Sequence, residues 1–308
     1  MLKEILELEF IMLLLILVGA LLRYRGKITD AGRECLTDVV IEAIIPCSIV
    51  LSFVGQGSLD KLLGSLPIIG LSILSMAAQV ALGKICFRHM EPEVKKLANY
   101  AMVNSNCMFI GFPVILSLLG EEGAMLQSLY MIFTRSFIWS YGLSILTGKG
   151  SNHKETVMRT LKHPCMIAAL IGIILMLTEA ELPDIISRTM GYFSSCLMAM
   201  SMLLIGSVLY GMDVKSIFRK DVWWYNLIRL VAAPAAALGI CLLLRVDYLM
   251  TGVVVIMAGM PSASMTAVLA PRYHCDVGYG SLVVATSTVA SIVTIPLWYM
   301  AVRMIFGM

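Results

Sequence analysis

Residues 104–113 read Asn-Ser-Asn-Cys-Met-Phe-Ile-Gly-Phe-Pro and interrupt a long apolar run with amides, small residues and a proline. Residues 259–266 read Gly-Met-Pro-Ser-Ala-Ser-Met-Thr and interrupt a second apolar run in the same way. A proline inside a helix removes a backbone donor and clashes with the preceding turn. In hydrocarbon, backbone groups freed in this way are tolerated only where protein or a water-filled cavity satisfies them. We therefore expect two broken helices whose interrupted segments lie inside the protein.

The composition around these stretches is that of a membrane protein with many spans. Of the 308 residues, 59% are apolar and only 14% are charged, and the mean hydropathy is +0.89. A soluble domain carries about 25% charged residues, so a soluble enzyme, a disordered protein and a nucleic-acid binder are excluded. Apolar windows that suit spans of about 20 residues predict an all-α polytopic membrane protein with ten transmembrane helices, at 8–22, 36–54, 65–87, 98–119, 122–147, 164–180, 189–211, 223–244, 248–271 and 277–305.

Basic residues are distributed unevenly between the two sides of these spans. The loops after the odd-numbered spans hold sixteen lysines and arginines, whereas the other side, which includes both termini, holds five. Basic residues accumulate in cytoplasmic loops. We therefore predict a multi-pass protein of the cell membrane with both termini on the non-cytoplasmic side.

A polar loop at 148–163 divides the chain almost in half. With five spans in each half, 1–150 and 151–308, the second repeat enters the membrane inverted, as in many secondary transporters. Half-helix N-termini at the two breaks would carry partial positive charge, which suits an anion. The alternative is a pair of proline kinks lined by small packing residues. The candidate substrate-binding residues are Asn104, Asn106, Gly111, Pro113, Pro261, Ser262, Ser264 and Thr266.

Three ionisable residues, Glu42, Arg135 and Arg229, fall within predicted spans. A charge that faces lipid costs about 2.5–3.5 kcal/mol on insertion scales, so each is expected to face protein or water. Arg135 lies deep in its span, where it either binds a substrate carboxylate or neutralises a partner in the core. Glu42 and Arg229 lie at similar depth, which favours a buried ion pair. A snorkelling Arg229 and proton coupling through Glu42 are the alternatives.

Motifs along essentially the whole chain resemble those of the auxin efflux carrier family of transporters. They include Gly19-Ala20-Leu21-Leu22-Arg23, Ile45-Pro46, Asn106 with Phe109-Ile110-Gly111-Phe112-Pro113, Arg229 with Ala233-Pro234, Pro261-Ser262-Ala263 and Ile295-Pro296-Leu297. The resemblance implies ten spans in two inverted repeats, with the broken helices 4 and 9 crossing at the substrate site. It also implies a scaffold of spans 1, 2, 6 and 7, which often dimerises, beside a transport domain of spans 3–5 and 8–10.

The resemblance further implies a class of substrate. Bacterial members are associated with malate, malonate and similar carboxylates, and plant members with auxin. This chain lacks the long cytoplasmic loop of many plant members and looks more like a bacterial carrier. It departs from the family pattern at Asn104, which adds a second amide beside Asn106, and at Glu42, where a neutral residue is expected.

The function predicted from these observations is secondary transport of small organic anions by alternating access. The expected partners are the anion, the lipid bilayer and a second copy of the chain, while H⁺, Na⁺ and the membrane potential remain open as driving forces. A sensor or channel on the same scaffold is the alternative. An intramembrane enzyme is less well supported, because no HExxH, GxSxG or phosphate-loop motif occurs. No cofactor, metal or nucleic-acid partner is expected.

Overall fold

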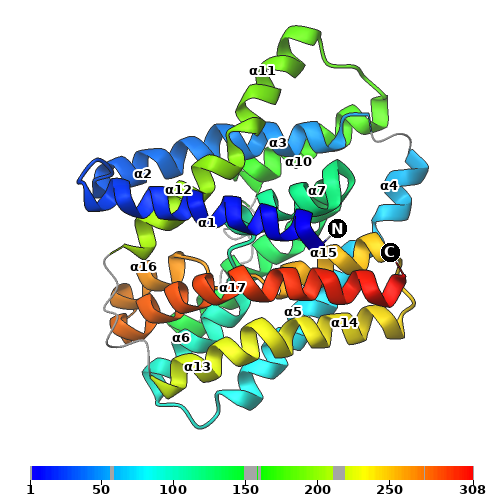
Figure 1. Ribbon diagram of the computed structural model, residues 1–308. Coiled ribbons are helices and arrows are strands. Elements are labelled where there is room, and N and C mark those ends of the chain that lie inside the picture. Colours follow the sequence, from blue (N-terminus) through cyan, green and yellow to red (C-terminus); the bar gives the residue numbers. More distant parts are fainter. Residues whose placement is uncertain are drawn as a thin grey trace. The chain divides into compact units, whose positions relative to one another are not determined.

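A computed structural model describes residues 2–55, 59–148, 158, 161–210, 219–273 and 275–307. The regular elements within these residues are all helices (Figure 1), which confirms the predicted fold class at the level of an all-helical membrane protein. Contacts within the chain define two compact units. Unit 1 comprises 1–67, 108–129 and 161–211, and unit 2 comprises 68–107, 130–160 and 212–308.

Unit 1 is a group of apolar helices, with α1 packed along α12 and with α10 and α11 packed on α3. Its elements are α1 (Leu2–Tyr24), α2 (Asp30–Val39), η1 (Val40–Ile44), α3 (Ile45–Phe53), α4 (Leu59–Ser65), most of η2 (Cys107–Gly111), the first part of α7 (Phe112–Phe137), α10 (Pro164–Thr178), α11 (Asp184–Ser195) and α12 (Leu197–Leu209).

Glycines set the closest helix contact in unit 1. A Cβ atom added to Gly206 of α12 would lie 1.9 Å from the carbonyl oxygen of Ile16, and one added to Gly19 of α1 would lie 2.2 Å from that of Leu203. Small residues allow helix backbones to approach this closely in membranes, where packing rather than water drives association. The two glycines therefore explain why α1 and α12 lie side by side (Figure 1).

Unit 2 contains both of the interrupted stretches, except for the end of the first one. Within it α15 packs against α14 and α17, and α17 also contacts α13, α16 and α6. Its elements are α5 (Pro67–Cys86), α6 (Pro92–Val103), the last part of α7, η3 (Ile138–Gly142), α8 (Leu143–Thr147), α13 (Lys220–Leu227), η5 (Ile228–Ala232), α14 (Ala233–Leu243), α15 (Tyr248–Ala258), α16 (Met265–Arg272) and α17 (Val277–Phe306).

A π-helical turn precedes three of the prolines. The turns η1, η2 and η5 end at Ile44, Gly111 and Ala232, and the prolines at positions 46, 113 and 234 follow two residues later in each case. A proline clashes with the carbonyl four residues before it, and that carbonyl lies inside the widened turn each time. The π-turn thus lets the helix continue through the proline instead of ending there.

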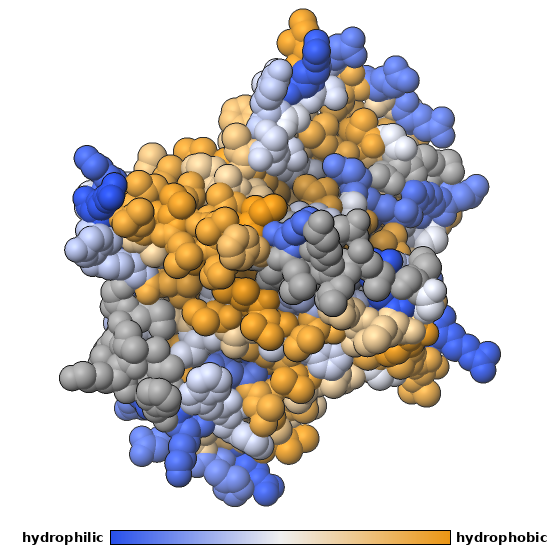
Figure 2. Space-filling view, viewed as in Figure 1, coloured by the Kyte–Doolittle hydropathy of each residue, from blue (hydrophilic) through white to orange (hydrophobic). Residues whose placement is uncertain are grey.

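Six helical segments of the described chain are long and apolar enough to cross a membrane: Asp30–Phe53, Asp60–Cys86, Cys107–Thr147, Asp184–Leu209, Lys220–Leu243 and Val277–Phe306. Shorter apolar helices lie at Phe10–Tyr24, Pro164–Thr178 and Tyr248–Ala258. Figure 2 shows hydrophobic side chains over much of the viewed face, with hydrophilic ones mostly near its margins. The protein is therefore a polytopic membrane protein.

The helices differ from the predicted spans mainly at the first interruption. The non-helical stretch covers 104–106 rather than 104–113, because η2 begins at Cys107 and Pro113 lies in the first turn of α7. The helix also kinks at Gly120, whose φ of 68° is a left-handed conformation that glycine adopts readily. Most of the predicted loop at 148–163 lies outside the described residues.

Candidate functional site

The first break begins where α6 ends. Asn104 follows the last helical residue, Val103, with φ −100° and ψ 83°, and the chain stays non-helical until Cys107. The Asn104 side chain is buried, and its Nδ2 donates to the hydroxyl of Tyr100 at 3.0 Å. Asn106 is also buried. This break therefore places two amide side chains inside unit 2.

The second break separates α15 from α16. Helix α15 ends at Ala258 and α16 begins at Met265. The hydroxyls of Ser262 and Thr266 are 3.0 Å apart, and the Ser262 amide donates to Oγ of Ser287 on α17 at 3.1 Å. Pro261, Ser262 and Thr266 are buried, whereas Ser264 is exposed. The N-terminal end of α16 is therefore accessible from outside the buried break.

The two breaks pair with each other through their backbones. Ser105 and Ser262 form an isolated antiparallel bridge. In this bridge the Asn106 amide donates to the Pro261 carbonyl at 2.8 Å, and the Ala263 amide donates to the Asn104 carbonyl at 2.9 Å. Backbone groups that the broken helices leave free are thus satisfied by the opposite break, as burial in an apolar environment requires.

Arg229, in η5, donates hydrogen bonds beside both breaks. Its Nε donates to the carbonyl of Met260 at 2.7 Å. Its Nη1 donates at 2.5 Å both to the carbonyl of Met102 and to Oε1 of Gln79. The side chain is 0% exposed, which contradicts the snorkelling alternative. Sequence reasoning missed these partners, although a buried glutamine in an apolar helix was a usable signal.

Two further buried polar atoms lie on the helix that carries Arg229. Oδ1 of Asn226 has no hydrogen-bond partner within the described residues, and neither does Nη2 of Arg229, whereas the Tyr225 hydroxyl lies within reach of Ser262. The amide nitrogen of Asn226 donates to Thr286 on α17 at 2.9 Å. Buried polar atoms normally find a protein, water or ligand partner. The polar residues Tyr225, Asn226 and Arg229 inside an apolar run were a usable signal in the sequence.

Arg135 lies in the last turn of α7 and is half-buried. It makes no hydrogen bond or ion pair to the rest of the described chain, and its charge acts on Tyr100, which accepts from Asn104, and on Cys107. The charge of Arg229 also acts on Cys107. The first residue after the break is therefore under the influence of two positive charges.

The remaining predicted residues lie in unit 1. Gly111 and Pro113 are buried where η2 passes into α7. Glu42 is exposed and lines a pocket of about 640 Å³ with Glu34 and Asp38. Because Glu42 and Arg229 belong to different units, their ion pair stays a prediction.

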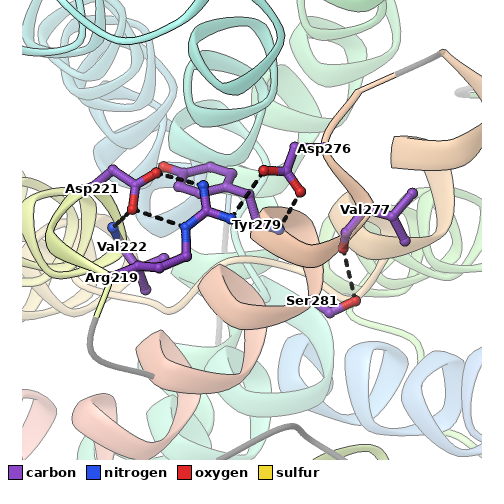
Figure 3. Close-up of polar contacts among 7 residues, drawn as sticks. All are labelled: Arg219, Asp221, Val222, Asp276, Val277, Tyr279 and Ser281. Carbon is purple, nitrogen blue, oxygen red and sulfur yellow. Dashed lines mark hydrogen bonds and ion pairs between the residues drawn. The ribbon is translucent and has the colours of Figure 1, made fainter. Parts of the chain in front are cut away.

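A charged cluster joins the N-terminal ends of α13 and α17 in unit 2 (Figure 3). Nη2 of Arg219 contacts Asp221 at 2.8 Å, and its Nη1 contacts Asp276 at 3.0 Å. Asp276 also accepts from the Tyr279 amide at 2.9 Å, which caps α17. Partial burial would raise the pKa of Asp276, but the Tyr279 amide and the Arg219 guanidinium outweigh it and hold this pKa below its ordinary value.

Comparison with known proteins identifies the family. The sequence model of the membrane transport protein family matches residues 4–299. An uncharacterized transporter of Methanocaldococcus jannaschii is 27% identical over an alignment of 305 positions, which covers 95% of this chain and 97% of the relative. An uncharacterized transporter of Methanothermobacter thermautotrophicus is 28% identical over an alignment of 292 positions, which covers 93% of this chain and 94% of the relative. The chain therefore belongs to the membrane transport protein family, the family of the auxin efflux carriers that its motifs resemble.

Proposed function

We propose that this protein is a secondary carrier of small organic anions, such as malate, malonate or auxin-like acids, that works by alternating access. The observation that carries the proposal is the backbone pairing of the two breaks at Ser105 and Ser262. Broken helices at the middle of a membrane form the substrate site in many secondary transporters. The buried amides of Asn104 and Asn106 and the hydroxyls of Ser262 and Thr266 supply hydrogen-bonding groups there.

The charges around the breaks favour an anion. Arg135 is half-buried without an acidic partner within the described residues, and its charge acts on Cys107 at the end of the first break. The N-terminal end of α16 adds partial positive charge beside the exposed Ser264. A negatively charged carboxylate gains from each of these contributions, whereas a cation would be repelled.

We further propose ten spans in two inverted five-helix repeats, 1–150 and 151–308, with both termini on the non-cytoplasmic side of the cell membrane. The positions of the helices support this count, since α6 with η2 and α15 with α16 supply the two interrupted spans. Unit 1 contains the expected scaffold spans together with 108–129, which was expected in the transport domain. We also propose that the protein forms a homodimer and that H⁺, Na⁺ or the membrane potential drives transport.

Counterflow in proteoliposomes tests this function. Vesicles loaded with unlabelled dicarboxylate are expected to accumulate labelled malate or malonate with saturable kinetics. Flux without saturation would instead support a channel, and no flux across a panel of carboxylates would contradict transport of organic anions.

Asn106→Ala tests whether the first break binds the anion. We expect uptake to fall about tenfold, since a lost hydrogen bond to a charged group is worth about 1.5 kcal/mol, while the yield of folded protein is unchanged. Asn99→Ala is the matched control, because Asn99 lies on α6 outside the break and donates to the carbonyl of Lys95. Unchanged uptake by Asn106→Ala, or an equal loss in both variants, would remove Asn106 from the site.

A further inference from the structure

The guanidinium of Arg229 lies where the carbonyl ends of two broken helices converge. Met102 is the second-last residue of α6, so its carbonyl is one of the four that have no partner inside that helix. Met260 lies two residues beyond the end of α15. Arg229 donates to both carbonyls and to the amide oxygen of Gln79.

The charge of Arg229 is matched by helix ends rather than by an acidic side chain. It is the only buried charged side chain within the described residues, and the three acceptors of its hydrogen bonds are neutral. The C-terminus of a helix carries a partial charge of about −0.5. Two such termini, those of α6 and α15, together balance about one positive charge, so the guanidinium and the two helix ends form a nearly neutral group.

Carbonyls of this kind bind cations in other carriers. Unwound backbone carbonyls and the C-terminal ends of half-helices coordinate Na⁺ or H⁺ in several transporter folds. Here the carbonyl oxygens of Met102 and Met260 and Oε1 of Gln79 form a set of three oxygen acceptors around one guanidinium. In this protein the cation at these oxygens is the guanidinium of Arg229 and not a bound ion.

We propose that Arg229 is a built-in cation that neutralises the carbonyl ends of both broken helices and keeps the two breaks paired. Removing its side chain leaves a cation-binding site made by Met102, Met260 and Gln79. Arg229 is thus a positioning residue for the proposed transport site. The inference extends the proposed function but is tested through protein stability, so it stands or fails independently of which solute is carried.

Chemical rescue of Arg229→Ala tests the proposal. The variant is solubilised and purified with millimolar guanidinium, with urea at the same concentration, or with neither. Guanidinium and urea are both planar hydrogen-bond donors, but only guanidinium is charged. We expect guanidinium, and not urea, to raise the melting temperature of the variant by about 2–4 °C. If the variant does not survive purification alone, the yield of monodisperse protein replaces the melting temperature as the readout.

Two controls separate a cation site from a general effect. Wild-type protein and Arg272→Ala, which removes an exposed arginine of the same unit, are expected to show no rise with guanidinium. Equal effects of guanidinium and urea, or no effect of either on melting temperature and yield, would overturn the proposal.

Conservative variants at the same position give a second test. Arg229→Lys keeps the positive charge. Arg229→Met keeps a side chain of similar length but removes the charge. We expect the lysine variant to melt several degrees above the methionine variant, because only lysine supplies a cation to the helix ends. A methionine variant as stable as the lysine variant would overturn the proposal.

Discussion

Unit 1 and unit 2 use their buried polar side chains differently. In unit 1, the hydroxyls of Ser52, Ser65 and Ser207 each donate to a carbonyl three or four residues earlier in the same helix. In unit 2, Arg229 donates to residues of other helices and of the second break, and Asn226 contacts Thr286 on α17. Unit 1 has a comparable link between helices, from Ser48 on α3 to Ser194 on α11 at 2.9 Å. In unit 2 the links made by Arg229 and Asn226 reach several helices and the second break.

This difference indicates how each unit maintains its packing. Helix association in lipid depends on close packing and on interhelical hydrogen bonds. Unit 1 relies on close packing, through the glycine contacts between α1 and α12. Unit 2 relies on hydrogen bonds between helices. Its broken helices leave backbone groups free, and only hydrogen bonds from neighbouring segments satisfy these groups. Variants that disturb packing should therefore act most strongly in unit 1, and variants that remove a hydrogen bond should act most strongly in unit 2.

Gly206→Ala is expected to give the largest effect. The added methyl would lie 1.9 Å from the backbone oxygen of Ile16, so α1 and α12 must separate. We expect a loss of about 3 kcal/mol or more, at the upper end of the range for overpacked cores, seen as a low yield of monodisperse protein and a reduced melting temperature.

Gly191→Ala is the matched control for this variant. Gly191 lies in α11 of the same unit, and an added Cβ there would meet nothing within 4 Å. Because alanine favours a helix over glycine by about 1 kcal/mol, this variant should be as stable as the wild type or slightly more stable. If both glycine variants behave alike, close packing does not distinguish unit 1.

Ser287→Ala is expected to have an intermediate effect in unit 2. The change leaves the buried amide of Ser262 without its acceptor, and an unsatisfied buried donor costs about 1–3 kcal/mol. Ser207→Ala in unit 1 should be nearly neutral, since the Ser207 hydroxyl only adds a second donor to the carbonyl of Leu204. Thermal unfolding of the two variants measures the difference, and equal losses would contradict the distinction between the units.

The sequence predicts the breaks well because their causes are local. Proline, amides and small residues inside apolar runs locate the non-helical segments at 104–106 and 259–264. The extent of the first break was overestimated, because Pro113 follows a π-turn and does not end a helix. The same spacing between a π-turn and a proline recurs at Pro46 and Pro234, but it is a feature of the backbone that the residues alone do not show.

The partners of Arg229 were not predictable in the same way. Gln79 and Met102 are separated from it by 150 and 127 residues along the chain. Two of its acceptors are backbone carbonyls, which carry no mark in the sequence because every residue has one. Similar depth in the membrane suggests Glu42 as a partner of Arg229, and that ion pair stays a prediction. The acceptors that the structure gives Arg229 are neutral oxygens at the breaks and on Gln79. Which charges meet inside a membrane protein therefore depends on tertiary structure.

Asp276→Asn should give the smallest effect and the clearest pH dependence. The variant keeps an oxygen to cap α17 but removes the charge that Arg219 contacts. Because these contacts lower the pKa of Asp276 from its ordinary value of 3.8, the stabilisation is fully present above that value. It is lost as the pH falls through the lowered native-state pKa. We expect the wild type to exceed the variant by about 0.5 kcal/mol at neutral pH, and the two melting curves to converge in acid.

Asp247→Asn provides the comparison within the same unit. Asp247 caps α15 through the amide of Met250, as Asp276 caps α17, but it forms no ion pair with the rest of the described chain. Its replacement by asparagine should therefore change stability less than Asp276→Asn at neutral pH. A larger loss for Asp247→Asn would mean that the helix cap, rather than the arginine link between α13 and α17, carries the stabilisation. Polar groups at the helix ends of unit 2 would then stabilise single helices and would not link one helix to another.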